Sequence, residues 1–147
     1  MSDSEFHFQA ILKLRENTRD EKRNALELVL ARGKELRTGL NDLDQLLIKR
    51  RNEWTREQRK RNVSLATLRF EAEEFDRLTL LREEQVQRIE ACREEEDACR
   101  QALVEAQKEV RILEKLRERK EEEQFEEQRR RETRQLDETN QRLDRRP

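Results

Sequence analysis

The sequence predicts an all-α fold: a long antiparallel two-helix coiled-coil hairpin with a charged C-terminal helical overhang. Three observations lead to this prediction. Of the 147 residues, 47% are charged and only 32% are hydrophobic. The chain has two glycines and one proline, and that proline is the last residue. Apolar side chains recur every three or four residues over two long stretches, which is the spacing of a coiled-coil seam.

Composition separates this fold from a globular domain and from a disordered chain. A compact domain of this length needs more apolar side chains to offset the chain entropy that is lost on folding. Disordered chains tend to be rich in Pro, Gly and Ser, whereas this chain is rich in Glu, Arg, Leu, Gln and Lys, which favour helix. We therefore expect a thin apolar seam along extended helices.

The first coiled-coil helix is predicted over residues 4–60. Its seam consists of two rows of residues seven apart, which are apolar from Leu26 to Leu47 except at Gly33. One row is Leu12, Arg19, Leu26, Gly33, Leu40, Leu47 and Trp54, and the other is Phe8, Arg15, Lys22, Val29, Leu36, Leu43 and Arg50.

The second coiled-coil helix is predicted over residues 65–117. Cys92 and Cys99 are small seam residues, and we expect them to be buried hydrophobes without a metal or redox role. Arg82, Gln85 and Glu96 interrupt this seam. One row is Leu68, Phe75, Arg82, Ile89, Glu96, Leu103 and Val110, and the other is Leu78, Gln85, Cys92, Cys99, Ala106 and Leu113.

A turn is predicted at residues 61–64, where Asn62 can adopt the left-handed conformation that ends a helix and Ser64 can cap the next. A continuous helix is the alternative, because neither Gly nor Pro enforces a stop. Folding about residue 61 sets Gly33 opposite Ile89, and it also sets Leu47 opposite Phe75 and Phe8 opposite about Glu114. The second seam then ends where the first helix begins, which antiparallel pairing explains and parallel self-pairing does not.

The tail, residues 118–147, has ten acids and nine bases, and its apolar side chains are Phe125, Leu136 and Leu143 alone. It has no partner helix at this level. We expect a charged tail that is helical or partly disordered and that orders fully on a partner.

Nothing in the sequence predicts an enzyme, a cofactor site or a metal site. The single histidine, His7, has no catalytic constellation around it, and no glycine-rich phosphate loop is present. Acidic runs at 94–97 and 121–123 splay around a helix, so they are expected to be solvated faces rather than ligands of one ion.

Charge and hydropathy bound the partners and the location. Acids and bases number 35 and 34, which argues against nucleic acid as a partner. No stretch approaches the roughly 20 apolar residues of a membrane span, so direct membrane insertion is not expected. The acidic start is unlike a signal peptide. Two free thiols favour the cytoplasm.

Three features predict contacts with other proteins. Residues 49–61 carry seven bases against two acids and could meet an acidic surface or nucleic acid, or could simply be solvated. Trp54, near the turn, and Phe70, outside the rows, are candidate anchors, or they pack across the hairpin. The open end could insert into a partner or staple the two helices, and its apolar residues are Phe6, Phe8, Ile11, Leu113 and Leu116.

Two segments carry a family resemblance. The opening, FHFQAILKLRE at residues 6–16, and the segment EVRILEKLRERK at 109–120 resemble the FliJ family of flagellar type III export components. The run from Gln128 through Leu136-Asp137-Glu138 continues the match. Together they cover both ends of the chain.

The resemblance implies a two-helix coiled coil similar to the stalk subunit of rotary ATPases. Family members bind the hexameric flagellar export ATPase through the open end, contact the export-gate membrane protein through the coil, and in some cases escort export chaperones. Leu47, Trp54 and Phe75 are similar to apolar members of the gate-binding patch, whereas Arg50 and Thr79 are polar where the family can be apolar.

The function implied is a non-catalytic stalk of the flagellar export apparatus, in the cytoplasm and peripherally associated with the inner membrane. Two alternatives remain open at this stage. One is the stalk protein of type III virulence secretion, which is similar in shape. The other is a structural coiled-coil adaptor that is unrelated to export.

Overall fold

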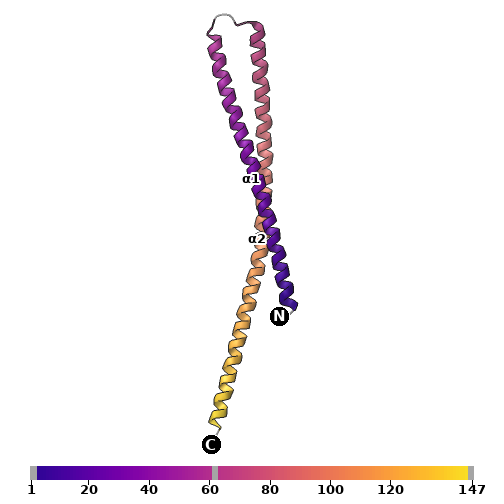
Figure 1. Ribbon diagram of the computed structural model, residues 1–147, viewed down its shortest axis with the longest axis vertical. Coiled ribbons are helices and arrows are strands. Elements are labelled where there is room, and N and C mark those ends of the chain that lie inside the picture. The colour runs from indigo at the N-terminus through magenta and orange to yellow at the C-terminus, as the bar shows by residue number, and fades with distance from the viewer. Residues whose placement is uncertain (1–2, 61–62, 146–147) are drawn as a thin grey trace. The chain divides into compact units, whose positions relative to one another are not determined.

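The computed structural model describes residues 3–60 and 63–145, and it consists of two helices joined by a turn (Figure 1). Helix α1 spans Asp3–Gln58 and helix α2 spans Leu65–Asp144. The predicted all-α, antiparallel two-helix fold is confirmed. The predicted turn includes residues 61 and 62, which lie outside the described residues, as do residues 146 and 147 of the tail.

Helix α2 begins at a side-chain cap. The Ser64 hydroxyl accepts a hydrogen bond of 3.2 Å from the backbone N–H of Thr67, and the Leu68 N–H bonds to the Ser64 carbonyl. This cap satisfies one of the donors that a helix start leaves free. The prediction of Ser64 as the N-cap is confirmed.

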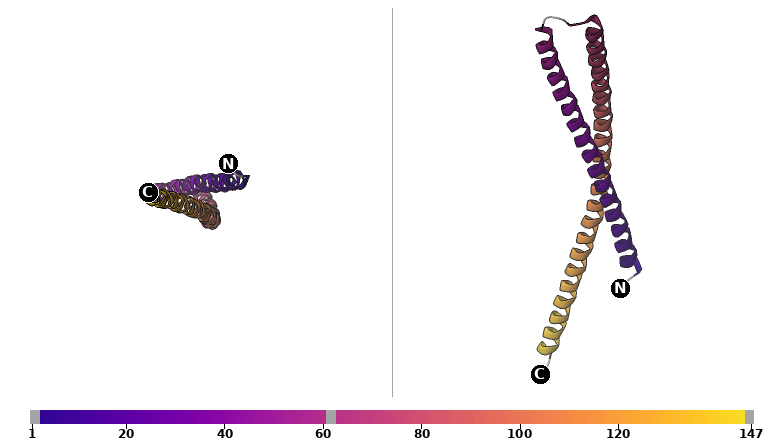
Figure 2. Two further views of the ribbon diagram at one scale, coloured as in Figure 1. Left: turned by 90° about the horizontal axis from the view of Figure 1, so that it is seen from below. Right: turned by 45° about the horizontal axis from the view of Figure 1, so that its top comes forward.

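The chain divides into two compact units, which we describe one at a time. In the unit of residues 21–103, α1 leads into the turn and α2 returns antiparallel beside it, as both views show (Figures 1 and 2). In the unit formed by residues 1–20 and 104–147, the start of α1 packs against the middle of α2. The later part of α2 then continues past that pairing, with every residue from Glu114 to Arg145 exposed.

The predicted seams form the core of both units. Each buried apolar residue lies in one of the four heptad rows, which confirms the rows as the packing surfaces. Three row members are exposed instead: Arg15, Lys22 and Leu68. The buried apolar residues are Leu12, Val29, Leu78, Ile89, Cys92, Ala106 and Val110.

The register differs from the predicted one. Gly33 lies against Cys92 and Glu96 rather than opposite Ile89. Likewise, the Phe8 ring meets Lys120, beyond the predicted Glu114. Going from Ile89 to Cys92 is a step of three residues, from one row to the other, so the same stripe of α2 still faces α1. Heptad rows alone therefore left this shift undetermined.

Candidate interaction surfaces and the polar cluster between the helices

A buried carboxylate lies between the helices in the unit of residues 21–103. Glu96 is only 5% exposed, although it occupies a seam position. Across from it stands Gly33, where an added Cβ would collide with the Glu96 Oε1 atom. The missing side chain of the glycine thus makes the space that the carboxylate fills.

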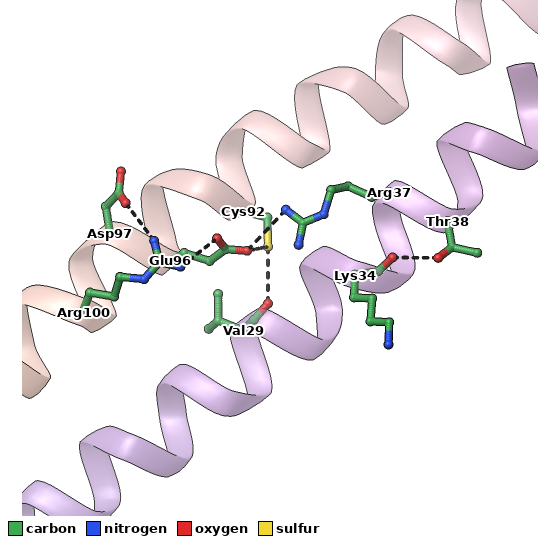
Figure 3. Close-up of polar contacts among 8 residues, drawn as sticks. All are labelled: Val29, Lys34, Arg37, Thr38, Cys92, Glu96, Asp97 and Arg100. Carbon is green, nitrogen blue, oxygen red and sulfur yellow. Dashed lines mark hydrogen bonds and ion pairs between the residues drawn. The ribbon is translucent and has the colours of Figure 1, made fainter.

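The partners of this carboxylate are all at long range. Glu96 Oε1 lies 4.0 Å from Arg37 Nη1, and Oε2 lies 4.0 Å from Arg100 Nη2. The Cys92 thiol donates to Glu96 Oε1 at 4.0 Å and to the Val29 carbonyl at 3.6 Å (Figure 3). Burial of a charge is costly unless close hydrogen bonds compensate it, so this cluster offsets only part of the desolvation.

The acidic run at 94–97 was predicted to be a solvated face, and for Glu96 that prediction is wrong. Its three neighbours in the run are exposed, but the seam runs through Glu96 because residue 96 follows residues 89 and 92 at heptad spacing. Among residues 3–60 and 63–145, no group of three or more His, Cys, Asp or Glu side chains converges as a metal site would require.

Two ion pairs join the helices nearer the turn. Arg82 Nε donates to Asp44 Oδ1 at 2.6 Å, and this hydrogen bond raises the pKa of the Arg82 guanidinium. Glu74 Oε2 lies 3.1 Å from Arg77 Nη2 and 3.7 Å from Arg50 Nη1. The hydrogen bond from Arg77, with the charges of both arginines, lowers the pKa of the Glu74 carboxyl below its ordinary 4.5. Arg50, which departs from the family's apolar pattern, thus takes part in pairing the helices.

We expect the Glu74 interaction to add a small stability that disappears in acid. Because the folded-state pKa is the lower one, the contribution is present above about pH 4.5 and is lost as pH falls through the folded pKa. Glu74→Gln should therefore melt slightly below the parent at neutral pH and at the same temperature near pH 2. Thermal melts at both pH values measure this, with the adjacent Glu73→Gln as the control. A gap that persists in acid would contradict the charge-based account.

The three residues predicted to contact a gate protein lie in the seam. Leu47, Trp54 and Phe75 are each half-buried, so they present edges rather than whole side chains. Trp54 shares a surface hollow with Phe70, and Phe70 is exposed. The accessible aromatic surface near the turn is therefore Trp54 with Phe70.

The five residues predicted at the open end belong to the other unit, and they do not form one patch. Phe8 and Leu113 are half-buried in the seam, whereas Phe6, Ile11 and Leu116 are exposed. Five residues separate Phe6 from Ile11, which is about 140° around a helix, so they face different sides. Phe6 packs edge-on against His7, with 6.4 Å between ring centroids.

Ile11 and Leu116 lie at one level on one edge of the pair. Along α1, Ile11 stands between Phe8 and Arg15; along α2, Leu116 stands between their partners Lys120 and Glu109. Each immediately precedes a seam position, and these two seam positions are equivalent in the heptads of the two helices. In an antiparallel pair, positions that flank the seam in this way lie on a common edge. We call Ile11 and Leu116 the open-end edge.

Beyond this edge, polar groups close the pairing. The Lys120 ammonium lies 5.5 Å from the centre of the Phe8 ring, and Gln124 Nε2 lies 3.5 Å from Glu5 Oε1. The groove between them has a volume of about 170 Å³, which is smaller than the ~300 Å³ at which small-molecule sites begin. This groove is therefore too small for a typical small-molecule ligand.

The comparisons with known proteins agree with this geometry. The model of the family described as flagellar FliJ protein matches residues 4–147, which is nearly the whole chain. The chain belongs to the FliJ family. This FliJ-family chain is therefore a component of the flagellar protein export apparatus, and the resemblance drawn from its two end segments is confirmed. Neither a curated protein nor a solved structure matches it.

Sequence reasoning missed the pairing of Gly33 with Glu96 as a unit. Each was noted as an irregularity in its own seam: Gly33 in the row that contains Leu47, and Glu96 in the row that contains Phe75. Two irregularities in facing seams are a signal that they compensate one another.

In the part of the FliJ-family chain that the structure describes, no helix is long and apolar enough to span a membrane.

Proposed function

We propose that this FliJ-family chain is a non-catalytic stalk that binds the hexameric ATPase of the flagellar export apparatus and the export gate. The ATPase would hydrolyse the ATP, and this chain would convey the resulting motion and help deliver chaperones with their cargo. It would act in the cytoplasm, held peripherally at the inner-membrane export apparatus. Membership of the family supports the flagellar system over a virulence-type system.

The observation that carries the proposal is the open-end edge. Ile11 and Leu116 are large apolar side chains, they are 47% and 44% exposed, and they lie at one level. Exposed apolar side chains that gather at one place on a thin coil are suited to anchor a partner. Leu113 and Phe8 support them from the seam, and Phe6 offers a separate contact on another side.

The gate contact is proposed for Leu47, Trp54 and Phe75, with the exposed Phe70 added. Their half-buried edges would supply shape complementarity to the gate protein, and the exposed Phe70 ring would supply apolar contact area. Because this group and the open-end edge belong to different units of the chain, one molecule has separate surfaces for two partners.

The test is the rate of ATP hydrolysis by the purified export ATPase as this chain is titrated in. We expect stimulation, and we expect the double variant Ile11→Ser/Leu116→Ser to weaken the apparent affinity about tenfold, because two apolar anchors are lost. Leu28→Ser is the matched control, since Leu28 is 74% exposed in the other unit.

The control variant should stimulate as the parent does. If neither stimulation nor co-purification occurs with the parent chain, the stalk proposal is wrong. If the double variant stimulates normally, the ATPase-binding surface lies elsewhere.

A further inference from the structure

Positive charge is in excess at the turn end of the hairpin. Residues 56–69 carry five bases and one acid, whereas the whole chain has a net charge of −1. We call the described residues of this segment, 56–60 and 63–69, together with Phe70 the basic tip. The near-zero net charge of the whole chain therefore conceals a strongly positive end. Next to this end, residues 49–55 and 71–77 are together almost neutral.

The four described cations of the basic tip have no ion-pair partner among the described residues. Among the described residues, no acidic side chain lies within ion-pair distance of Arg56, Arg59, Lys60 or Arg69, and all four are exposed. Arg50, one level below, is paired with Glu74. Arg56 lies in the last turn of α1, Arg59 and Lys60 follow its end, and Arg69 lies near the start of α2. The unpaired bases therefore come from both arms of the hairpin and gather around its end instead of following one helix face.

Large apolar side chains are exposed at the same end. Leu65, the first residue of α2, is 78% exposed, and Leu68 and Phe70 are also exposed within the next two turns. A surface hollow is lined by Leu65, Ala66, Arg69, Phe70 and Glu73, which places the Arg69 guanidinium beside exposed apolar side chains, with one carboxylate at its lower side. Unpaired bases around exposed Leu and Phe side chains match the interface of an anionic bilayer, where acyl chains lie under phosphate groups.

We propose that the basic tip binds the surface of an anionic phospholipid membrane end-on. Arg56, Arg59, Lys60 and Arg69 contact lipid phosphates, and Leu65 and Phe70 enter the region between the headgroups and the acyl chains. This contact is peripheral and involves no spanning segment.

A nucleic acid or an acidic protein fits these observations less well. A duplex or a binding groove takes bases along one face, whereas these bases surround an end. A flat anionic surface can meet all of them together. The inference does not depend on the ATPase, but it uses the Phe70 ring that is also proposed for the gate contact.

The test is co-flotation of the full chain with phospholipid vesicles. We expect binding to vesicles that are half phosphatidylglycerol, weakened by salt, and no binding to pure phosphatidylcholine. Arg56→Gln/Arg59→Gln/Lys60→Gln should reduce binding on the order of 100-fold, since each base near the surface contributes about a factor of five. Leu65→Gln should reduce it about tenfold.

The matched control removes the same charge from the tail: Arg130→Gln/Arg134→Gln/Arg142→Gln, all at exposed positions. It should bind vesicles as the parent does. Equal losses in the two triple variants would overturn the proposal, and so would failure of the parent to bind. If the parent ignores vesicles but is retained on a polyglutamate or DNA column through the tip, the surface takes an acidic macromolecule and the membrane proposal is wrong. Trp54 fluorescence checks that the tip variants keep their fold, and far-UV circular dichroism checks the helix content of the tail variant.

Discussion

Leu78→Ala is expected to destabilise the unit of residues 21–103 by about 2–4 kcal/mol, because the truncation removes buried apolar atoms and leaves a cavity that a two-helix seam fills only in part. Leu78 is 3% exposed and lies in the row that continues to Cys92. A two-helix coil has no third layer to share the loss. One such substitution therefore removes a large fraction of the usual marginal stability of a folded unit.

Urea denaturation followed by Trp54 fluorescence measures this change. Trp54 is the only tryptophan, and it is half-buried in the same unit, so its signal reports on that unit and not on the tail. Leu80→Ala is the matched control, since Leu80 lies two residues away on α2 and is 56% exposed. It should change stability by less than about 0.5 kcal/mol. Equal midpoints for the two variants would show that the seam assignment is wrong.

Glu96→Leu is expected to act in the opposite direction and to stabilise the same unit by about 1–3 kcal/mol. The carboxylate is buried, yet its nearest charged atoms, on Arg37 and Arg100, are both 4.0 Å away. Gly33 leaves room across the seam for a branched apolar side chain. Leucine therefore exchanges a poorly compensated charge for an apolar contact.

The same fluorescence assay applies, with Glu94→Leu as the control. Glu94 is exposed two positions before Glu96 on α2, so its replacement should leave stability within about 0.5 kcal/mol. A loss of stability in Glu96→Leu would mean that the long-range arginine interactions outweigh desolvation. In that case Arg37→Gln should reproduce much of the loss.

How far the sequence predicts this fold depends on which property is considered. Heptad spacing identified the faces that pack, because burial follows the helical repeat: Leu12, Val29 and Val110 are all buried row members. Register was not predictable in the same way. Moving one helix by three residues exchanges Ile89 for Cys92 and preserves the stripe, so only specific shapes, such as the space at Gly33, decide it.

The interaction surfaces were predictable only as lists of apolar residues. Whether such residues share a surface depends on angle and level, which need the pairing as well as the sequence. The pairing puts Ile11 and Leu116 on one edge and leaves Phe6 on another side. Near the turn, the pairing places Leu47, Trp54 and Phe75 in the seam and leaves Phe70 accessible.

The unpaired end of α2 has a consequence for amide hydrogen exchange. The polar contacts that join α2 to α1 reach Gln124, and about twenty residues of the same helix follow, all of them exposed through Arg145. An isolated helix of that length is marginal in water, so its amides should exchange quickly, while those around Val110 exchange slowly. A single helix thus carries a steep gradient of local opening. A protein that binds the tail would slow exchange there first, and exchange along α2 would locate it without any label.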